Sequence, residues 1–342
     1  MDHHRPLSAV DVLDRAAALY RANFALLFVL AFVSGAIYFV LQQLVWLASP
    51  IPAIPMPGTE PGLAAFGGVL ASYAQSGSIG VVSWFLQLWS TAALVYAVSR
   101  RHVGLPVTFG EAIRNTLGRL PYLFVTQLVL TFFMMLTFVG LYAIAFAVGF
   151  SVVFGLGDGN AWAALGSAMG AAFGLALLLG GLVGILRFWV HSAAVIVEGL
   201  GIGDALARSR DLMRQVGKIP FGQRNDVRLT VVLTVVPLIG LAAASLVFLP
   251  MAASAIAAYV LHWVDFSNPE QLMQRVMAPV IAVQIAAGAL LHPFSVAATV
   301  LFYYDLRYRT EGLDLEMRAL RLRKPRAPRV ARPVASAVPG PG

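Results

Sequence analysis

Three things are scarce or missing in this 342-residue sequence, and each absence excludes a class of protein. There is no cysteine, which excludes disulfides, thiol catalysis and cysteine-ligated metal or iron–sulfur sites. Charged residues make up only 12% of the chain, whereas a soluble domain averages about 25%. The motifs of common soluble enzymes, a P-loop, G-x-S-x-G or H-E-x-x-H, do not occur. We therefore expect no cofactor and no metal site, and a protein that is not a soluble enzyme.

Hydrophobic residues are abundant instead, at 59% of the chain, and the mean hydropathy is +0.79. A membrane-spanning helix needs roughly 20 mostly apolar residues. We predict an all-α polytopic membrane helix bundle whose six spans lie at 24–47, 79–98, within 122–156, within 166–197, within 229–263 and at 279–304. No cleavable signal peptide is expected, because the first apolar run is too long for one.

Two of these apolar blocks, 122–156 and 229–263, are longer than one crossing requires. As single helices they would exceed the hydrocarbon core of about 30 Å. They are expected either to protrude from the bilayer or to break, with Gly140 and Pro250 as candidate break points. Breaking both would give eight spans, which is the alternative that still fits the distribution of positive charge between the spans.

The positive charges indicate how the chain is oriented. All Lys and Arg residues except Arg187 and Arg275 lie in four segments, 1–23, 99–120, 200–228 and 305–332. The loops between alternate spans carry almost none. This distribution is typical of the positive-inside rule, and it predicts a bacterial inner-membrane protein with both termini in the cytoplasm. The net charge of +8 is explained in this way, so nucleic acid is not an expected partner.

The sequence is read as a threefold internal repeat within one membrane domain, residues 1–316. The units are about 8–105, 106–200 and 201–316, and each starts with an amphipathic segment followed by two spans. Ser8-x-x-Asp11 and Thr108-x-x-Glu111 have the spacing of a capping box at the start of a helix. Residues 317–342 are basic and rich in Pro and Ala, and we expect a disordered cytoplasmic tail.

Arginines on the first and third amphipathic segments are candidate contacts for lipid head groups, namely Arg15, Arg21, Arg208 and Arg214. A helix of this kind lies in the membrane interface with its arginines toward lipid phosphates. The alternative is a solvated helix packed on the bundle. Asp204 precedes Arg208 by four residues, which predicts an ion pair along the helix.

Three ionisable residues fall within the predicted spans: Arg187, His191 and His292. Arg187 and His191 are four residues apart, so an unbroken helix would place them on one face. An ionisable side chain inside the bilayer is a functional hypothesis by default. The alternative is that the span ends earlier and Arg187 reaches the interface. Glutamines in the spans, such as Gln87 and Gln284, are expected to bond between helices, and the spacing Gly166-x-x-x-Gly170-x-x-x-Gly174 predicts close helix packing.

Three stretches carry a family resemblance: 12–24, from Val12-Leu13-Asp14-Arg15; 198–209, from Glu198-Gly199-Leu200-Gly201; and 302–314, from Phe302-Tyr303-Tyr304-Asp305. Together they resemble the integral-membrane domain that is attached to some bacterial glycerophosphoryl diester phosphodiesterases and also occurs in stand-alone uncharacterised membrane proteins. The resemblance implies that hydrolysis belongs to a separate soluble barrel. The motifs of that barrel are not found here, so no catalytic residue is carried over. The segment 217–223 departs from the family pattern.

Three functional hypotheses arise from these observations. The first is a non-enzymatic membrane protein that interacts with membrane lipids, anionic phospholipids among them, or with a membrane protein partner at the cytoplasmic leaflet. The second is a transporter or lipid-translocating protein with a polar cavity at Arg187 and His191. The third is a membrane-embedded enzyme that acts on lipid head groups.

Overall fold

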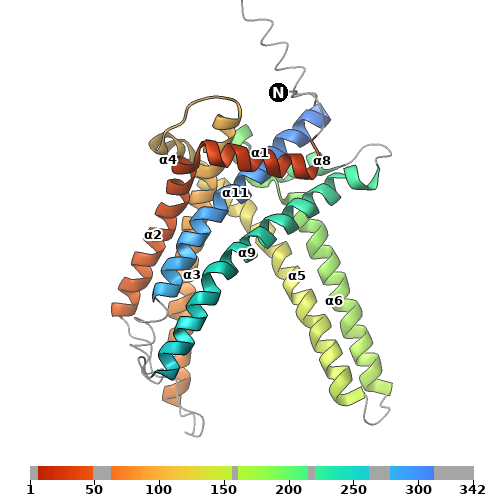
Figure 1. Ribbon diagram of the computed structural model, residues 1–342. Coiled ribbons are helices and arrows are strands. Elements are labelled where there is room, and N and C mark those ends of the chain that lie inside the picture. The colour runs from red at the N-terminus through yellow and green to blue at the C-terminus, as the bar shows by residue number, and fades with distance from the viewer. Residues whose placement is uncertain (1–6, 49–62, 156–160, 215–219, 262–277, 312–342) are drawn as a thin grey trace, which may run out of the picture.

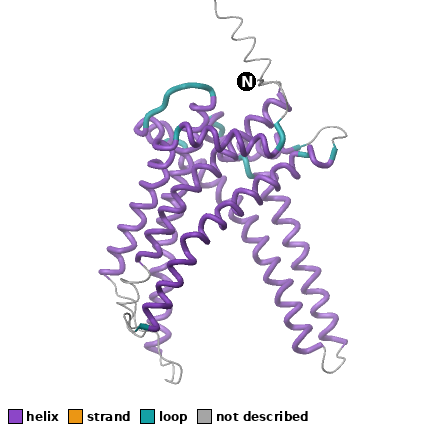
Figure 2. Tube along the Cα trace, in the orientation of Figure 1, coloured by secondary structure: helices purple, strands orange, loops and turns teal. Residues whose placement is uncertain are grey.

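The computed structural model describes residues 7–48, 63–155, 161–214, 220–261 and 278–311. Within these ranges every regular element is a helix (Figure 2). The basic tail 317–342, for which the sequence predicts disorder, lies outside the described residues.

A short helix followed by two long helices occurs three times along the chain. The first set is α1 (Ala9–Ala22), α2 (Phe24–Ala48) and α3 (Leu63–His102); the second is α4 (Phe109–Leu117), α5 (Leu120–Gly155) and α6 (Ala161–Phe188); the third is α8 (Ile202–Met213), α9 (Asn225–Val260) and α11 (Ala278–Glu311). Asp11, Glu111 and Asp204 each occupy the third position of their short helix. The threefold internal repeat stays a prediction from the sequence.

Capping explains where the short helices begin. Ser8 and Asp11 form a complete capping box on α1, and Thr108 and Glu111 form one on α4, as predicted. The hydrogen bonds that Glu111 accepts from Thr108 hold the pKa of this carboxyl below its usual range. On α8 the cap is Gly201, which has no side chain to bond the helix end.

The prediction of six spans is confirmed. Within the described residues, six segments are long and apolar enough to cross a membrane: Phe24–Ala48, Gly77–His102, Leu120–Val152, Ala164–Glu198, Asn225–Ala243 and Ala278–Glu311. Both long blocks are single helices, because α5 continues through Gly140 and α9 through Pro250. Of the two alternatives, the unbroken helix is therefore the one observed, the candidate breaks at these two residues do not occur, and the eight-span alternative loses its support. Helix α3 also starts earlier than predicted, since no proline follows Pro61 until Pro106.

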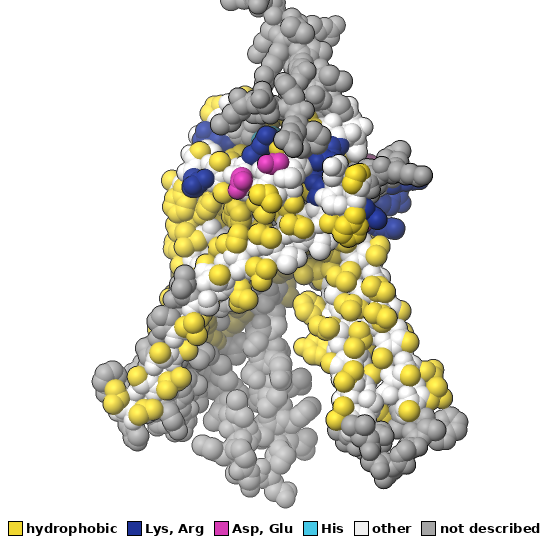
Figure 3. Space-filling model, turned by 45° about the vertical axis from the view of Figure 1, so that its right-hand side comes forward, with side chains coloured by type: hydrophobic (Ala, Val, Ile, Leu, Met, Phe, Trp, Pro, Cys, Tyr) yellow, Lys and Arg dark blue, Asp and Glu magenta, His cyan; other side chains and the backbone are white. Residues whose placement is uncertain are grey.

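The long helices meet at one end of the molecule and diverge toward the other (Figure 1). Helices α2, α3, α9 and α11 lean to one side, while α5 and α6 form a hairpin that leans away. In the space-filling view the hairpin stands apart over its lower half, and hydrophobic side chains cover it (Figure 3). Lys and Arg side chains gather where the helices meet. We call this region, made of α1, α4, α8 and the adjoining ends of the long helices, the charged end.

The hairpin is held together by glycines that let two backbones approach. A Cβ atom on Gly140 of α5 would lie 2.5 Å from the backbone nitrogen of Leu178 and 2.6 Å from the carbonyl oxygen of Gly174. Gly170 and Gly174 of the predicted small-residue series face α5, whereas Gly166 faces open space. The outward surface is apolar and uncovered; Tyr142 and Phe146 are each 74% exposed. Such a surface fits the apolar interior of a bilayer.

The buried core lies at the charged end, where α1, α2, α3 and α11 pack together. Its largest fully buried side chains include Leu27, Leu94, Phe302, Tyr303 and Leu306. Residues 302–306 of α11 are all buried. The charged end is therefore the best-packed part of the molecule, and it holds the polar groups of the candidate site in position.

Candidate functional site

The helical path changes at the charged end of α6. The α-helix ends at Phe188, and a turn at Trp189–Val190 leads into α7 (His191–Ala193) and the π-helix η1 (Ala194–Glu198). Gly199 then takes a left-handed conformation, with φ of 71°, which ends η1. This break turns the chain so that α8 lies across the end of α6.

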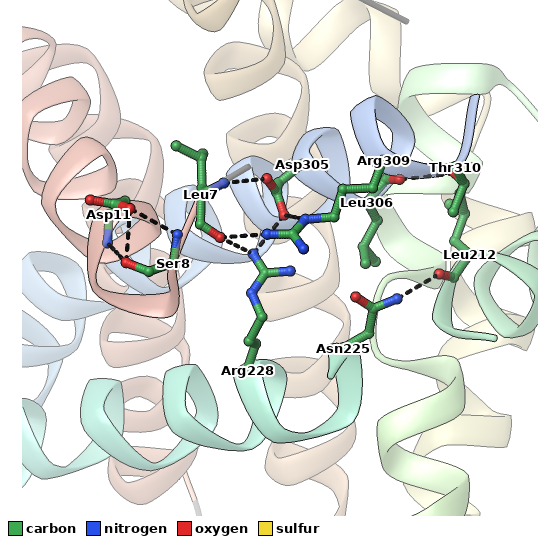
Figure 4. Close-up of polar contacts among 10 residues, drawn as sticks. All are labelled: Leu7, Ser8, Asp11, Leu212, Asn225, Arg228, Asp305, Leu306, Arg309 and Thr310. Carbon is green, nitrogen blue, oxygen red and sulfur yellow. Dashed lines mark hydrogen bonds and ion pairs between the residues drawn. The ribbon is translucent and has the colours of Figure 1, made fainter. Parts of the chain in front are cut away.

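Two hydrogen bonds fix α8 against its neighbours. The Ser209 hydroxyl donates to the carbonyl oxygen of Arg187 at 3.0 Å and ties α8 to the end of α6. The Asn225 amide donates to the carbonyl oxygen of Leu212 at 3.5 Å and ties α8 to the start of α9 (Figure 4). The short 3-10 helix η2 (Phe221–Gln223) leads into α9. The ends of α6 and α8 and the start of α9 thus converge.

A pocket of about 700 Å³ lies at this convergence. We call it the arginine pocket. Its charged lining residues are Arg187, Arg210, Asp211, Arg214, Arg224 and Asp226. Its apolar lining residues are Val183, Leu186 and Met213. The volume falls within the roughly 300–1,000 Å³ that is typical of small-molecule sites. The pocket thus combines a cationic rim with an apolar wall on the membrane side.

The aspartates compensate only part of this positive charge. Arg210 Nε lies 3.3 Å from Asp211 Oδ1, and Arg224 Nη2 lies 3.0 Å from Asp226 Oδ2. Both pairs are exposed, and exposed pairs contribute only about 0–1 kcal/mol. Among the described residues, Arg187 and Arg214 form no ion pair. The pocket therefore keeps an excess of positive charge, and its two existing pairs are weak enough to exchange for a stronger anion.

This chain matches no protein-family model, no curated protein and no solved structure. Its class comes from its own helices. It is an all-α membrane protein, since six of its described segments are long and apolar enough to span a bilayer.

Two polar clusters flank the arginine pocket and hold the charged end together. The first joins the N-terminal segment to α9 and α11 (Figure 4). Asp305 accepts a hydrogen bond from the Leu7 N–H at 3.1 Å and pairs with Arg228 Nη2 at 2.6 Å and Arg309 Nε at 2.9 Å. Both arginines also donate to the Leu7 carbonyl oxygen at 2.7 Å. The side chains of Arg228 and Asp305 are only 2% exposed, so this is a buried ion pair.

The second cluster centres on Glu198 at the end of η1. Its carboxylate accepts from Arg208 Nε at 3.0 Å and from the Tyr303 hydroxyl. Arg208 also pairs with Glu311, and Arg307 lies between the two carboxylates. Burial disfavours the charge on Arg208, but the hydrogen bonds and charges of the two glutamates outweigh that effect and raise its pKa. The stretch 198–209 and residues 302–311 of the third stretch therefore meet in space.

The predicted head-group residues are placed very differently from one another. Arg214 lines the arginine pocket. Arg208 is engaged with Glu198 and Glu311, so the predicted ion pair with Asp204 is wrong. Arg15 is half-buried on α1, and Arg21 is exposed at its end, where it donates to the carbonyl oxygen of Ala17. The structure does not bring Arg15 and Arg21 into the arginine pocket.

The three intramembrane candidates are also separated. Arg187 lies at the end of α6 and lines the arginine pocket, and the apolar segment Ala164–Glu198 continues beyond it. His191 follows the turn, is 1% exposed, and bonds through Nδ1 to the carbonyl oxygen of Phe188 at 2.8 Å. His191 does not line the arginine pocket beside Arg187, and a turn at Trp189–Val190 separates the two residues. His292 lies on α11, far along the chain from both, and contacts Gln87.

Sequence reasoning missed Arg210 and Arg224 as site residues. A usable signal exists for Arg210, which precedes Arg214 by four residues and so shares a helix face with it. No comparable signal marks Arg224, since it joins the site only through the turn between α8 and α9.

Proposed function

We propose that this protein is a non-enzymatic membrane protein that binds the phosphate group of an anionic phospholipid in the arginine pocket. The observation that carries the proposal is the excess of arginine over aspartate in a pocket with an apolar wall. Arginine binds phosphate oxygens through two parallel hydrogen bonds, which suits a phosphodiester. Val183 and Leu186 on α6 offer a surface along which acyl chains run toward the bilayer.

We further propose that the charged end faces the cytoplasm. Positive charge is retained on the cytoplasmic side of bacterial inner membranes, and the charged end carries α1, α4 and α8 with their arginines. The anionic lipids of that leaflet attract basic residues by about 1 kcal/mol each. The resemblance in stretches 12–24, 198–209 and 302–314 supports membership of the membrane-domain family that accompanies some phosphodiesterases, without the hydrolase.

The geometry favours binding over the transporter hypothesis in its stated form. That hypothesis requires Arg187 and His191 in one polar cavity. Arg187 lines the arginine pocket. His191 does not line it and is buried in the protein.

Replacing both Arg187 and Arg214 by alanine is expected to weaken the binding of phosphatidylglycerol. At about 1 kcal/mol for each charge, the loss is about 2 kcal/mol, or about 30-fold in affinity. Native mass spectrometry of the detergent-solubilised protein, titrated with phosphatidylglycerol, measures the change directly. Phosphatidylcholine serves as the uncharged comparison lipid.

The matched control is the double variant Arg15→Ala/Arg21→Ala, which removes the same charge from the same end of the molecule but outside the pocket. We expect its affinity for phosphatidylglycerol to fall by less than about threefold, as partial screening predicts. Equal losses in the two double variants would show diffuse surface attraction and would overturn the pocket proposal.

The orientation has its own test. A reporter enzyme fused after Ala48, at the end of α2, should lie in the periplasm, and one fused after His102, at the end of α3, should lie in the cytoplasm. Alkaline phosphatase and green fluorescent protein fusions distinguish the two compartments. Activity of both phosphatase fusions, or of neither, would contradict the topology.

A further inference from the structure

A second cavity, of about 560 Å³, lies between α2, α3 and α11. These three helices lie side by side in Figure 1. Its polar lining residues are Ser34 and Tyr38 of α2, Ser83 and Gln87 of α3, and Gln284 and His292 of α11. Among the described residues no Lys, Arg, Asp or Glu lines it. The cavity shares no residue with the arginine pocket, so a ligand bound in it is independent of the proposed function.

This cavity lies at the depth of the hydrocarbon core. Along α2, Ser34 is about 15 Å from Phe24 at the charged end, at a rise of about 1.5 Å per residue. Along α3, Gln87 is about 22 Å from His102. The hydrocarbon core is about 30 Å thick. Polar groups at this depth have no bulk water to bond with, and each unsatisfied one costs several kcal/mol.

Some of the polar lining is satisfied by the protein itself. The Ser34 hydroxyl donates to the carbonyl oxygen of Ala31, and the Ser83 hydroxyl donates to that of Gly80. The nitrogen Nε2 of Gln87 lies 3.3 Å from Nε2 of His292. These contacts confirm the expectation that Gln87 bonds between helices.

Other polar atoms in the cavity have no protein partner. Within the described part of the chain, neither the Gln284 amide nor the Tyr38 hydroxyl makes a hydrogen bond, and Gln87 uses only its nitrogen. The side chains of Gln87 and Gln284 are exposed within the cavity. An amide offers a carbonyl acceptor and two N–H donors. The cavity therefore presents both donors and acceptors, and its described lining carries no formal charge.

The cavity also has space for a ligand. Gly80 and Gly288 line the cavity, and a Cβ atom added to either would meet nothing within 4 Å. The apolar lining, from Trp84, Ile281 and Ile285, suits a hydrocarbon chain. The cavity thus joins apolar walls to a small set of neutral hydrogen-bonding groups, which is the usual make-up of a ligand site.

We propose that this cavity binds the hydroxyl-bearing end of a neutral glycerolipid, such as a mono- or diacylglycerol. Free hydroxyls both donate to the Gln284 carbonyl oxygen and accept from its N–H groups, while the acyl chains stay in the bilayer. A charged phospholipid head group is excluded, since no charged side chain in the described lining would offset the cost of desolvating it.

The test uses the full-length protein in detergent micelles and native mass spectrometry. The probe is dioctanoylglycerol, which has one free hydroxyl, and the comparison is trioctanoylglycerol, which has none. We expect dioctanoylglycerol to bind and trioctanoylglycerol to bind at least about tenfold more weakly, because the hydroxyl supplies the hydrogen bonds to Gln284.

Two variants locate the site. Gln284→Leu keeps the side-chain volume and removes the amide, and we expect about tenfold weaker binding. Gly288→Leu fills the cavity and should abolish binding. The matched control is Gly149→Leu on α5, a glycine that also faces open space but lies outside the cavity, and it should bind as the unaltered protein does. If Gly288→Leu does not fold, Gln284→Leu decides the question.

Three results would overturn this proposal: no binding of dioctanoylglycerol by the unaltered protein, equal binding of the two glycerides, or unchanged binding by Gln284→Leu. The first result would mean that the cavity holds no glyceride and is filled by water. The variant Arg187→Ala separates this site from the arginine pocket, because it should weaken phosphatidylglycerol binding and leave dioctanoylglycerol binding unchanged.

Discussion

Replacing Asp305 by asparagine is expected to destabilise the folded protein by about 3–5 kcal/mol. Asp305 is the only acidic residue described in its cluster, where it faces Arg228, Arg309 and the Leu7 N–H. Without it, the guanidinium of Arg228 would be buried without a counter-charge. Two of its nitrogens, Nε and Nη1, already have no partner within the described residues. Unfolding in mixed detergent–dodecyl sulfate micelles, followed by tryptophan fluorescence, measures the loss.

The matched control is Asp211→Asn, which removes a carboxylate from an exposed pair at the same end of the protein. Exposed pairs contribute about 0–1 kcal/mol, so this variant should unfold close to the unaltered protein. Equal stability of the two variants would mean that the buried cluster does not hold the charged end together.

Replacing Gly181 by alanine is expected to destabilise the α5–α6 hairpin by about 1–3 kcal/mol. The new Cβ atom would lie 2.7 Å from the backbone oxygen of Phe133 and the backbone nitrogen of Thr137, and it would clash with the Thr137 hydroxyl. Backbone atoms cannot move aside as a flexible side chain does, so the two helices must separate. The same unfolding titration reports the change.

The neighbouring glycine provides the control. Gly180 has nothing within 4 Å of its added Cβ position, and alanine favours helix over glycine by about 1 kcal/mol. Gly180→Ala should therefore be neutral or slightly stabilising. A similar effect of both substitutions would mean that close backbone contact does not hold the hairpin.

The number of spans and the capped starts of α1 and α4 follow from local properties of the sequence. Hydropathy over roughly 20 residues and the spacing of Ser8 and Asp11 act within one helix, so they are readable without the fold. The sequence leaves the continuity of α5 open, because a glycine such as Gly140 has two opposing effects on a helix. It weakens a helix in isolation, but it also allows α6 to approach, and that contact is visible only in three dimensions.

Only part of the candidate site was predicted from the sequence, because some of its residues come together only in three dimensions. Arg187 and Arg214 stood out by their positions in the sequence, whereas Arg224 joins them only after the chain turns twice. Arg208 was assigned a local partner, Asp204, yet it bonds with Glu198 and Glu311. Helical periodicity predicts which residues are neighbours along one helix. It does not predict ion pairs with carboxylates on other helices.

The bonds of Leu7 have a consequence for biosynthesis. They join residues separated by 298 and 302 positions in the chain. The first helix leaves the ribosome before its anchors on α11 are translated. Until then the N-terminal segment lacks its hydrogen bonds to α11, and Arg228 lacks its ion pair with Asp305. The bonds of Leu7 therefore form only after α11 has been synthesised, so a chain that terminates before α11 lacks these bonds at its N-terminal end.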